Sequence, residues 1–164
     1  MLPEELRHRL ETRIAASAHP RELVVDVMYE LQNHYGFLND VALREVAELL
    51  KLTPLEVEEL ATFYDFIYRR PVGRFVLHVC DGVVCWMFEE QSALDYICKL
   101  LGVAPGETTP DGQFTVLPTV CVGYCDHAPA MLINGKLYGP LTPEFIDRTL
   151  EELRSISCDL VLCR

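Results

Sequence analysis

The chain is poor in positive charge and has no long apolar run. Its 164 residues include 14 Lys and Arg against 25 Asp and Glu, which gives a net charge of −11 at pH 7. Because phosphate groups bind basic surfaces, this deficit argues against nucleic acids and acidic membranes as partners. Charges or prolines interrupt every apolar stretch before the ~18 residues that a membrane span needs. The N-terminal stretch is amphipathic and lacks an apolar core, so we expect neither a secretion signal nor insertion into a membrane.

Two motifs of common redox enzymes are also missing. The sequence has no Gly-x-Gly-x-x-Gly, so we expect the chain to bind no dinucleotide by itself. It has no Cys-x-x-Cys, the dithiol on which disulfide oxidoreductases depend. What it does have is a globular, half-hydrophobic composition and seven cysteines. An odd number of cysteines in a chain without an export signal indicates metal, cofactor or catalysis rather than a disulfide framework.

Residues 1–72 are predicted to form a small all-helical bundle. A first helix begins near Pro3, since proline is tolerated in a first turn, and ends before Pro20. A second helix ends at Gly36, a plausible left-handed stop. The faces predicted to be buried are Leu6, Leu10 and Ile14 in the first helix, and Leu23, Val24, Val27, Met28 and Leu31 in the second.

Two more helices are predicted in the same stretch. Asp40 is expected to cap the third. Thr53 and Glu56 have the spacing of a capping box with proline between them, which predicts a fourth helix that runs to about Ile67. The face predicted to be buried in the third helix is Val41, Leu43, Val46, Ala47 and Leu50.

This last helix pair has the shape of a DNA-binding helix-turn-helix. Its second helix, however, carries only acidic charges, at Glu56, Glu58, Glu59 and Asp65. DNA would repel such a helix, so we reject that interpretation. Its apolar residues exceed what a small bundle needs; we expect most of them to pack in the core and some to face a protein partner.

Residues 73–164 alternate strands and helices, as in a small α/β sandwich. Gly102 is expected to end a helix, and Thr142 to begin one. Asn134-Gly135 is the strongest short signal for a hairpin turn. The predicted elements are, in chain order, strand 74–79, helix 89–101, strand 114–117, strands 131–133 and 136–138, and helix 143–153.

Four cysteines follow the first two of these strands in two pairs. Cys80 and Cys85 enclose four residues, and Cys121 and Cys125 enclose three. Adjacent strands that end together would bring the two loops close enough to share one centre. Four thiolates suit either tetrahedral zinc or a [2Fe–2S] cluster. Zinc mostly favours tight two-residue spacers, whereas the wider spacers suit two irons with two cysteines each.

Glycines inside the loops bear on this choice. A cluster with four thiolates carries net negative charge, so it needs backbone N–H donors aimed at its sulfurs. We expect Gly82 and Gly123 to allow the backbone conformations that expose such donors.

At this level of detail the sequence resembles a known family over nearly its whole length. The residues that carry the resemblance are Cys80-x4-Cys85, the run CVGYCDHAP at 121–129, Asn134-Gly135, YGPLTP at 138–143 and ATFYDF at 61–66. They are similar to the thioredoxin-like [2Fe–2S] ferredoxin subunit of the NADH-oxidising module of respiratory complex I. The same subunit type recurs in NAD-linked hydrogenases and formate dehydrogenases.

The resemblance implies a function and a set of ligands. Cys80, Cys85, Cys121 and Cys125 would ligate one [2Fe–2S] cluster, in a thioredoxin-like domain preceded by the helical bundle. The partner would be a larger subunit that binds NADH, FMN and a [4Fe–4S] cluster and exchanges single electrons with this chain. The isolated chain would catalyse nothing. We expect it to be cytoplasmic and peripheral to a membrane complex, on the matrix side if mitochondrial.

One departure from the family and four further residues complete the expectations. Some members carry a polar residue such as His after the second cysteine; here the apolar run at 86–88 follows, which we expect to form a lid that excludes water from the site. Cys98 is expected in the core. Cys158 and Cys163 have no matching second pair and are expected to be free surface thiols, or an adventitious disulfide formed after purification, rather than a metal site. His127 is expected to be hydrogen-bonded or exposed rather than a ligand, because four thiolates complete a cluster.

Overall fold

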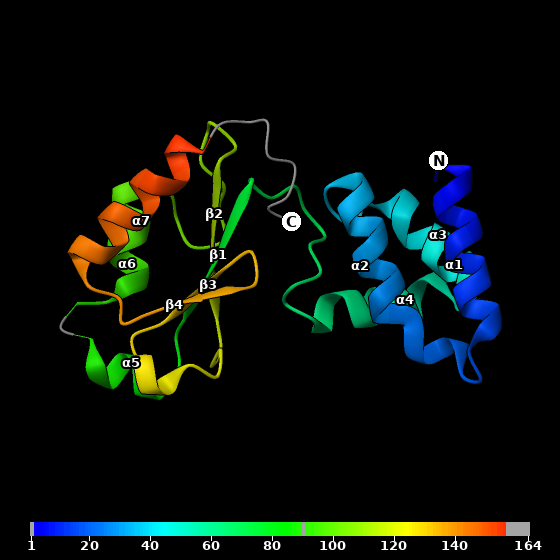
Figure 1. The fold of residues 1–164 in the computed structure, drawn as a ribbon, viewed down its shortest axis with the longest axis horizontal. Coiled ribbons are helices and arrows are strands. Elements are labelled where there is room, and N and C mark those ends of the chain that lie inside the picture. Colours follow the sequence, from blue (N-terminus) through cyan, green and yellow to red (C-terminus); the bar gives the residue numbers. More distant parts are fainter. Residues whose placement is uncertain (1, 90, 157–164) are drawn as a thin grey trace. The chain divides into compact units, whose positions relative to one another are not determined.

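The computed structural model describes residues 2–89 and 91–156, and the chain forms two compact units, Met1–Pro71 and Val72–Arg164 (Figure 1). Within the described residues the first unit contains only helices, and the second contains a sheet with helices. The predicted fold class, an α/β domain preceded by an all-helical bundle, is confirmed. No helix in the described ranges is long and apolar enough to cross a membrane.

The helical unit is held by one apolar core. Its elements are α1 (Glu4–Ala16), a short 3-10 helix η1 (Pro20–Leu23), α2 (Val24–Tyr35), α3 (Asp40–Leu50) and α4 (Pro54–Phe63). Leu10, Met28, Leu31 and Val46 are completely buried in the core. Each side chain of this size stabilises the unit by about 1.5–3 kcal/mol relative to leaving it exposed. The predicted ends of α1 and α2 are confirmed, and Gly36 has the left-handed φ of 86°.

The start of α3 differs from the prediction. Asn39, not Asp40, is the cap: its Oδ1 accepts hydrogen bonds from the N–H groups of Val41 (3.0 Å) and Ala42 (2.9 Å). The cap therefore lies one residue earlier, and Val41 is half exposed instead of buried. Both residue types favour this position, so sequence alone did not distinguish them.

The predicted capping box at Thr53 and Glu56 is confirmed, but α4 ends at Phe63 rather than near Ile67. The buried amide of Gln32 on α2 explains the early end. It donates to the carbonyl of Phe66 (2.9 Å) and accepts from the N–H of Tyr68 (2.5 Å). Those backbone groups are thus satisfied by a distant side chain and need no helix.

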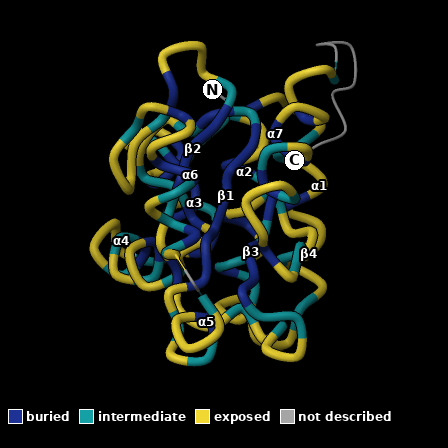
Figure 2. The backbone as a smooth tube through the Cα atoms, turned by 90° about the vertical axis from the view of Figure 1, so that its left-hand side faces the viewer, coloured by how far each residue is buried: buried dark blue, intermediate teal, exposed yellow. Residues whose placement is uncertain are grey.

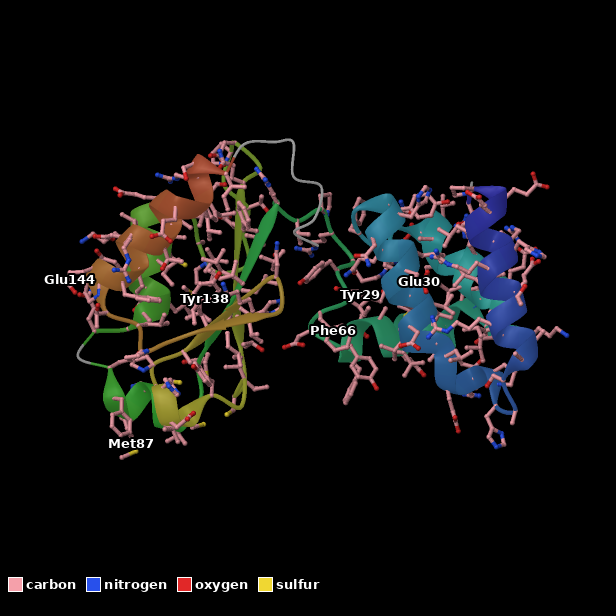
Figure 3. All side chains as sticks on the ribbon, viewed as in Figure 1. Tyr29, Glu30, Phe66, Met87, Tyr138 and Glu144 are labelled. Carbon is pink, nitrogen blue, oxygen red and sulfur yellow. The ribbon has the colours of Figure 1, made fainter. Side chains whose placement is uncertain are left out.

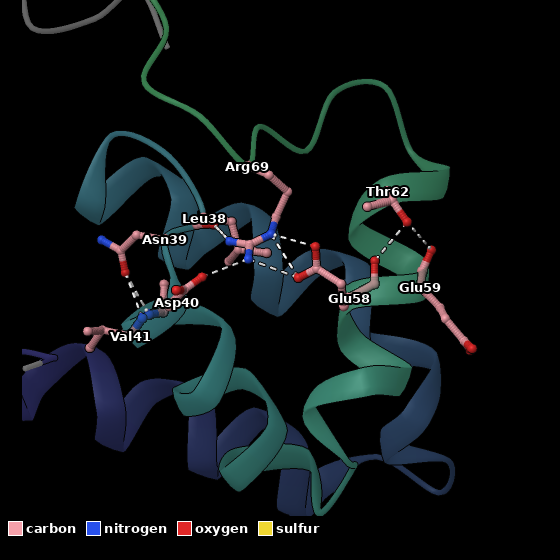
Figure 4. Close-up of polar contacts among 9 residues, drawn as sticks. Leu38, Asn39, Asp40, Val41, Glu58, Glu59, Thr62 and Arg69 are labelled. Atoms are coloured by element: carbon pink, nitrogen blue, oxygen red, sulfur yellow. Dashed lines mark hydrogen bonds and ion pairs between the residues drawn. The ribbon is translucent and has the colours of Figure 1, made fainter.

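Arg69 ties the segment after α4 to the start of α3 (Figure 4). Its Nε donates to both carboxylate oxygens of Glu58, at 3.1 and 2.9 Å. A terminal nitrogen donates to Asp40 Oδ1 at 2.9 Å, and the other donates to the carbonyl of Leu38. The planar guanidinium matches this fork of acceptors, which explains an arginine at this position.

The second unit is built on a four-stranded sheet with the order β2-β1-β3-β4. The strands are β1 (Phe75–Cys80), β2 (Phe114–Thr119), β3 (Met131–Ile133) and β4 (Lys136–Tyr138). β1 and β2 are parallel and pair from Phe75 opposite Phe114 to Cys80 opposite Thr119. The other pairs are antiparallel, and the predicted hairpin at Asn134-Gly135 is confirmed, with φ of 47° and 81°.

Two helices, α6 (Ala93–Leu101) and α7 (Pro143–Ser155), pack on one face of this sheet (Figure 1). Ile97 and Ile146 reach from them into a core with Leu77 and Phe114. Figure 2 shows β1 buried along its length.

Only the second part of the predicted helix 89–101 forms a helix in the structure, as α6. Ser92 caps α6, and its hydroxyl accepts from the N–H of Asp95 at 3.2 Å. A separate short helix, α5 (Val83–Phe88), precedes it and was not predicted. Its six residues are too few for helical periodicity to be recognised in the sequence.

Candidate metal centre

The four predicted ligands lie at one end of the sheet. β1 and β2 are parallel neighbours, so the loops that follow them leave the sheet at the same edge. Cys80 is the last residue of β1, and Cys85 lies within α5. Cys121 follows β2 by two residues, and Cys125 begins the short 3-10 helix η2 (Cys125–His127).

Backbone hydrogen bonds fasten the two loops together. The N–H of Asp81 donates to the carbonyl of Thr119 at 2.8 Å, and the N–H of Cys80 donates to that of Ala130 at 3.1 Å. Gly82 lies between the pairs: a Cβ added there would be 3.4 Å from Cys80 Sγ and 3.6 Å from Cys121 Cβ. The fold therefore brings both predicted pairs to one place.

The two pairs differ in exposure. Cys80 and Cys85 are only 4% and 2% exposed, whereas Cys121 and Cys125 are exposed to solvent. Burial raises the pKa of the Cys85 thiol to about 11, and the neighbouring Cys80 adds to the shift. In the exposed pair the two Sγ atoms lie 3.3 Å apart.

Gly123 acts as predicted. Its φ is +79°, a conformation that glycine adopts without strain, and its N–H donates to Cys121 Sγ at 3.4 Å. This N–H lowers the pKa of Cys121, while the hydrogen bond with Cys121 raises the pKa of Cys125. The prediction for Gly82 is wrong, because its φ of −77° and ψ of 151° are open to any residue. What glycine provides there is the absence of a side chain beside the cysteines.

Tyr124 and His127 bracket the last cysteine, an arrangement that was not predicted from the sequence. Their rings stack in parallel with centroids 4.2 Å apart and an angle of 6°. His127 Nδ1 also lies 3.0 Å from Asp126 Oδ2, and this contact lowers the pKa of Asp126. The sequence does place an aromatic ring on each side of Cys125, and this pattern could have predicted the stacking.

The apolar run after Cys85 does not form the predicted lid. Trp86, Met87 and Phe88 are 68%, 70% and 67% exposed, and Val83 on the same helix is 67% exposed. Figure 3 shows Met87 projecting outward from α5. These side chains of α5 are therefore turned mainly toward solvent in this chain alone.

The stretch of sequence that contains the four cysteines carries mostly negative charge. Between residues 75 and 135, Lys99 is the only lysine or arginine, against seven Asp and Glu. The backbone N–H groups are therefore the main positive electrostatic contribution that this stretch offers to a negatively charged ligand.

The remaining cysteines fall as expected where the structure describes them. Cys98 is buried in the sheet-unit core, which confirms its prediction. Burial raises the pKa of its thiol. Cys158 and Cys163 lie outside the described residues.

The donor set fits a centre that takes cysteines two by two. Two thiolates on one tetrahedral metal, at metal–sulfur distances of about 2.3 Å, lie about 3.7 Å apart, close to the separation in the exposed pair. Within residues 2–89 and 91–156, no three His, Cys, Asp or Glu side chains are grouped to hold a single metal ion. A [2Fe–2S] cluster takes two cysteines at each iron, and sulfides supply the rest.

Fold and site together define a small α/β domain that presents four cysteines at one end of its sheet. Comparison with known proteins makes this more specific. The sequence profile of the thioredoxin-like [2Fe–2S] ferredoxin family matches residues 10–154. The chain belongs to this family.

The relatives are parts of oxidoreductases. The chain is 36% identical over 151 residues to an NADH-quinone oxidoreductase subunit of Pseudomonas aeruginosa, covering 92% of this chain and 91% of that protein. It is 38% identical over 148 residues to the corresponding subunit of Escherichia coli K12, covering 90% and 89%. Among solved structures it is similar to an NAD⁺-reducing [NiFe]-hydrogenase in the air-oxidised state, with 30% identity and a TM-score of 0.68. That match covers 82% of this chain but only 24% of the hydrogenase chain.

Proposed function

We propose that this chain is the [2Fe–2S] electron-transfer subunit of an NADH:quinone oxidoreductase, and that it exchanges single electrons with the FMN of a partner NADH-oxidising flavoprotein. The observation that carries the proposal is the pairing of four cysteines at the ends of two adjacent parallel strands. Near-full-length similarity to one subunit type of two bacterial NADH-quinone oxidoreductases supports the choice of complex. Residues 1–72 and 73–164 are the proposed domains, and only the second would bind the cluster.

Each part of the site would have a distinct role. Cys80 and Cys85 would hold one iron from a buried loop, and Cys121 and Cys125 would hold the other from an exposed loop. When bound, a [2Fe–2S] cluster accepts and returns one electron. The N–H of Gly123 stabilises negative charge on Cys121 Sγ. Because no lysine or arginine lies nearby in sequence, such N–H donors would be this chain's main means of raising the reduction potential.

The exposed apolar side chains of α5 support a protein partner at this end of the domain. Val83, Trp86, Met87 and Phe88 are all exposed on this one short helix, and we call these four side chains the α5 surface. Carboxylates such as Asp81 and Glu89 flank it in sequence. We assign it to the flavoprotein, whose matching surface would have an apolar centre with a rim of lysine and arginine.

A second parent complex is also compatible with the chain. The structural similarity to a hydrogenase supports an NAD-linked hydrogenase as the alternative, and a formate dehydrogenase would use the same chemistry. In each case the chain would be a cytoplasmic subunit, peripheral to any membrane part, and would catalyse nothing alone. The alternative from a different functional class is a structural protein whose four cysteines bind zinc and that serves as an assembly adaptor rather than an electron carrier.

Metal and sulfide analysis tests the cofactor. We expect anaerobically purified protein to be coloured and to contain two irons and two acid-labile sulfides per chain. Colourless protein with stoichiometric zinc would overturn the electron-transfer proposal in favour of the zinc adaptor.

The partner is tested by adding NADH. The cluster of the isolated chain should stay oxidised, and the visible spectrum should bleach only when the purified flavoprotein is also present. Rapid reduction by NADH without a flavoprotein would contradict the proposed division of labour.

A further inference from the structure

The geometry points to Cys121 and Cys125 as an oxidation-sensitive pair: in the metal-free chain they form a disulfide with each other, and this disulfide blocks loading of the cluster. The first part concerns the bare chain and does not depend on the cofactor. The second part rests on the proposed function, since it assumes that both thiols are ligands.

Proximity makes this pair ready to close. The Sγ atoms lie 3.3 Å apart and need to approach to about 2.05 Å for a covalent bond. The intervening segment is only three residues long and includes Gly123 at φ +79°. Its backbone is therefore less constrained sterically than one with side chains at every position.

Exposure distinguishes this pair from the other. An external oxidant has to reach a sulfur atom, and Cys121 and Cys125 are both exposed. Cys80 and Cys85 are 4% and 2% exposed and pack against Ala130 in a small apolar cluster. The same asymmetry excludes Cys98, which is buried in the core.

The oxidant we assign is a low-molecular-weight disulfide such as oxidised glutathione. Cys121, whose sulfur accepts the N–H of Gly123, attacks one sulfur of the oxidant, and the first glutathione thiol leaves. Cys125 then attacks Cys121 Sγ and displaces the second. The two protein thiols lose two electrons and two protons, and one oxidised glutathione becomes two reduced molecules.

The consequence is that one half of the site can be closed off before assembly. A disulfide has no thiolate to offer a metal, so one iron would lose both of its protein ligands. Cys80 and Cys85 would remain reduced, and a thiol reductant would restore the full site.

The test uses the full-length chain with Cys158→Ser and Cys163→Ser, which removes the two thiols of unassigned role. The metal-free protein is incubated with oxidised glutathione, unfolded, alkylated and mapped by mass spectrometry. We expect loss of two thiols and a cross-linked peptide that joins Cys121 to Cys125. Matched variants sharpen the result: Cys85→Ser should form the same cross-link, whereas Cys125→Ser should retain one glutathione on Cys121.

Several outcomes would overturn the inference. A cross-link from Cys80 to Cys85 or to Cys121, a stable glutathione adduct in the parent chain, or four unmodified site thiols would each contradict the first part. Cluster reconstitution with iron and sulfide tests the second part: the oxidised sample should stay colourless until a thiol reductant is added. Equal colour in oxidised and reduced samples would refute the block. If the cross-link forms but neither sample takes up a cluster, the proposed function fails while the disulfide stands.

Discussion

The two units use their polar groups in opposite ways. In the helical unit, arginines pair across helices: Arg13 contacts Asp26 and Glu30 on α2, and Arg69 joins Glu58 to the start of α3. In the sheet unit, backbone hydrogen bonds join the two loops of the site, and the thiols of Cys121 and Cys125 remain exposed. Charge in the first unit therefore serves stability, whereas the polar atoms at the end of the sheet are left for a ligand. Substitutions in the two units should separate along this line.

The largest expected effect is loss of the cluster from Cys121→Ala. This variant would remove one of the two protein ligands proposed for one iron, so the visible absorption and the bound iron should disappear while the helical unit remains folded. Cys98→Ala is the matched control, because Cys98 lies in the core and should keep the cluster. If both variants lost the visible absorption and the bound iron equally, the proposed division of the cysteines into four ligands and one core residue would be wrong.

Next in size is Gly139→Ala, which tests whether fold and site are linked in the sheet unit. An added Cβ would overlap the carbonyl oxygen of His127 and lie 3.1 Å from that of Pro129. Moving this backbone should lower the free energy of unfolding by about 2–3 kcal/mol and weaken cluster retention, since His127 follows Cys125 closely. Gly106→Ala, at φ +90° with open space around it, should cost about 1 kcal/mol and leave the cluster unchanged. If chemical denaturation gave the same loss of unfolding free energy for both variants, the backbone around His127 and Pro129 would have to move aside at no cost.

Arg69→Ala should have a smaller effect, confined to the helical unit. The variant removes hydrogen bonds to Glu58, Asp40 and the carbonyl of Leu38, and we expect about 1–2 kcal/mol of destabilisation. The cluster spectrum should not change. Arg70→Ala removes the same charge from the next residue and should stay within about 0.5 kcal/mol of the parent. A loss of cluster in the Arg69 variant would contradict the separation of the two units.

The smallest effect is expected from Glu56→Gln, and it depends on pH. The N–H of Thr53 holds the pKa of Glu56 below the usual 4.5, so the ionised carboxylate stabilises the folded state above that pH. This contribution is lost as the pH falls through the lowered pKa. The parent should therefore melt slightly above the variant at pH 7, and the difference should shrink as the pH falls through the lowered pKa. Glu59→Gln, on the same helix, controls for net charge; a pH-independent difference for Glu56→Gln would refute the assignment.

Local signals in the sequence predicted most of the fold. Gly36, the capping box at Thr53 and the turn at Asn134-Gly135 act within a few residues, and the structure confirms all three. Failures occurred where distant groups decide. The end of α4 depends on Gln32, which lies more than thirty residues away in sequence. No local pattern contains that information.

The candidate site shows the same limit. The spacing of the cysteines and the two predicted strands before them were enough to predict that all four lie together, because neighbouring parallel strands end at one edge of the sheet. The difference in burial between the pairs was not predictable, since it depends on α5 and on Ala130 packing beside Cys85. The prediction of an apolar lid at residues 86–88 was wrong for a related reason. The sequence shows that these residues are apolar, but it does not show whether another part of the chain covers them.

The pairing of β1 has a consequence for the lifetimes of the two loops. β1 is hydrogen-bonded along both edges, to β2 and to β3, so its amide hydrogens should exchange with solvent only when the whole unit opens. The loop around Cys121 and Cys125 is free of such pairing in its centre and should exchange through local opening. One iron would thus be anchored to the slowest-exchanging strand and the other to a fast-exchanging loop. The slowing of exchange at residues 121–125 on loading would then measure how much order the cofactor itself imposes.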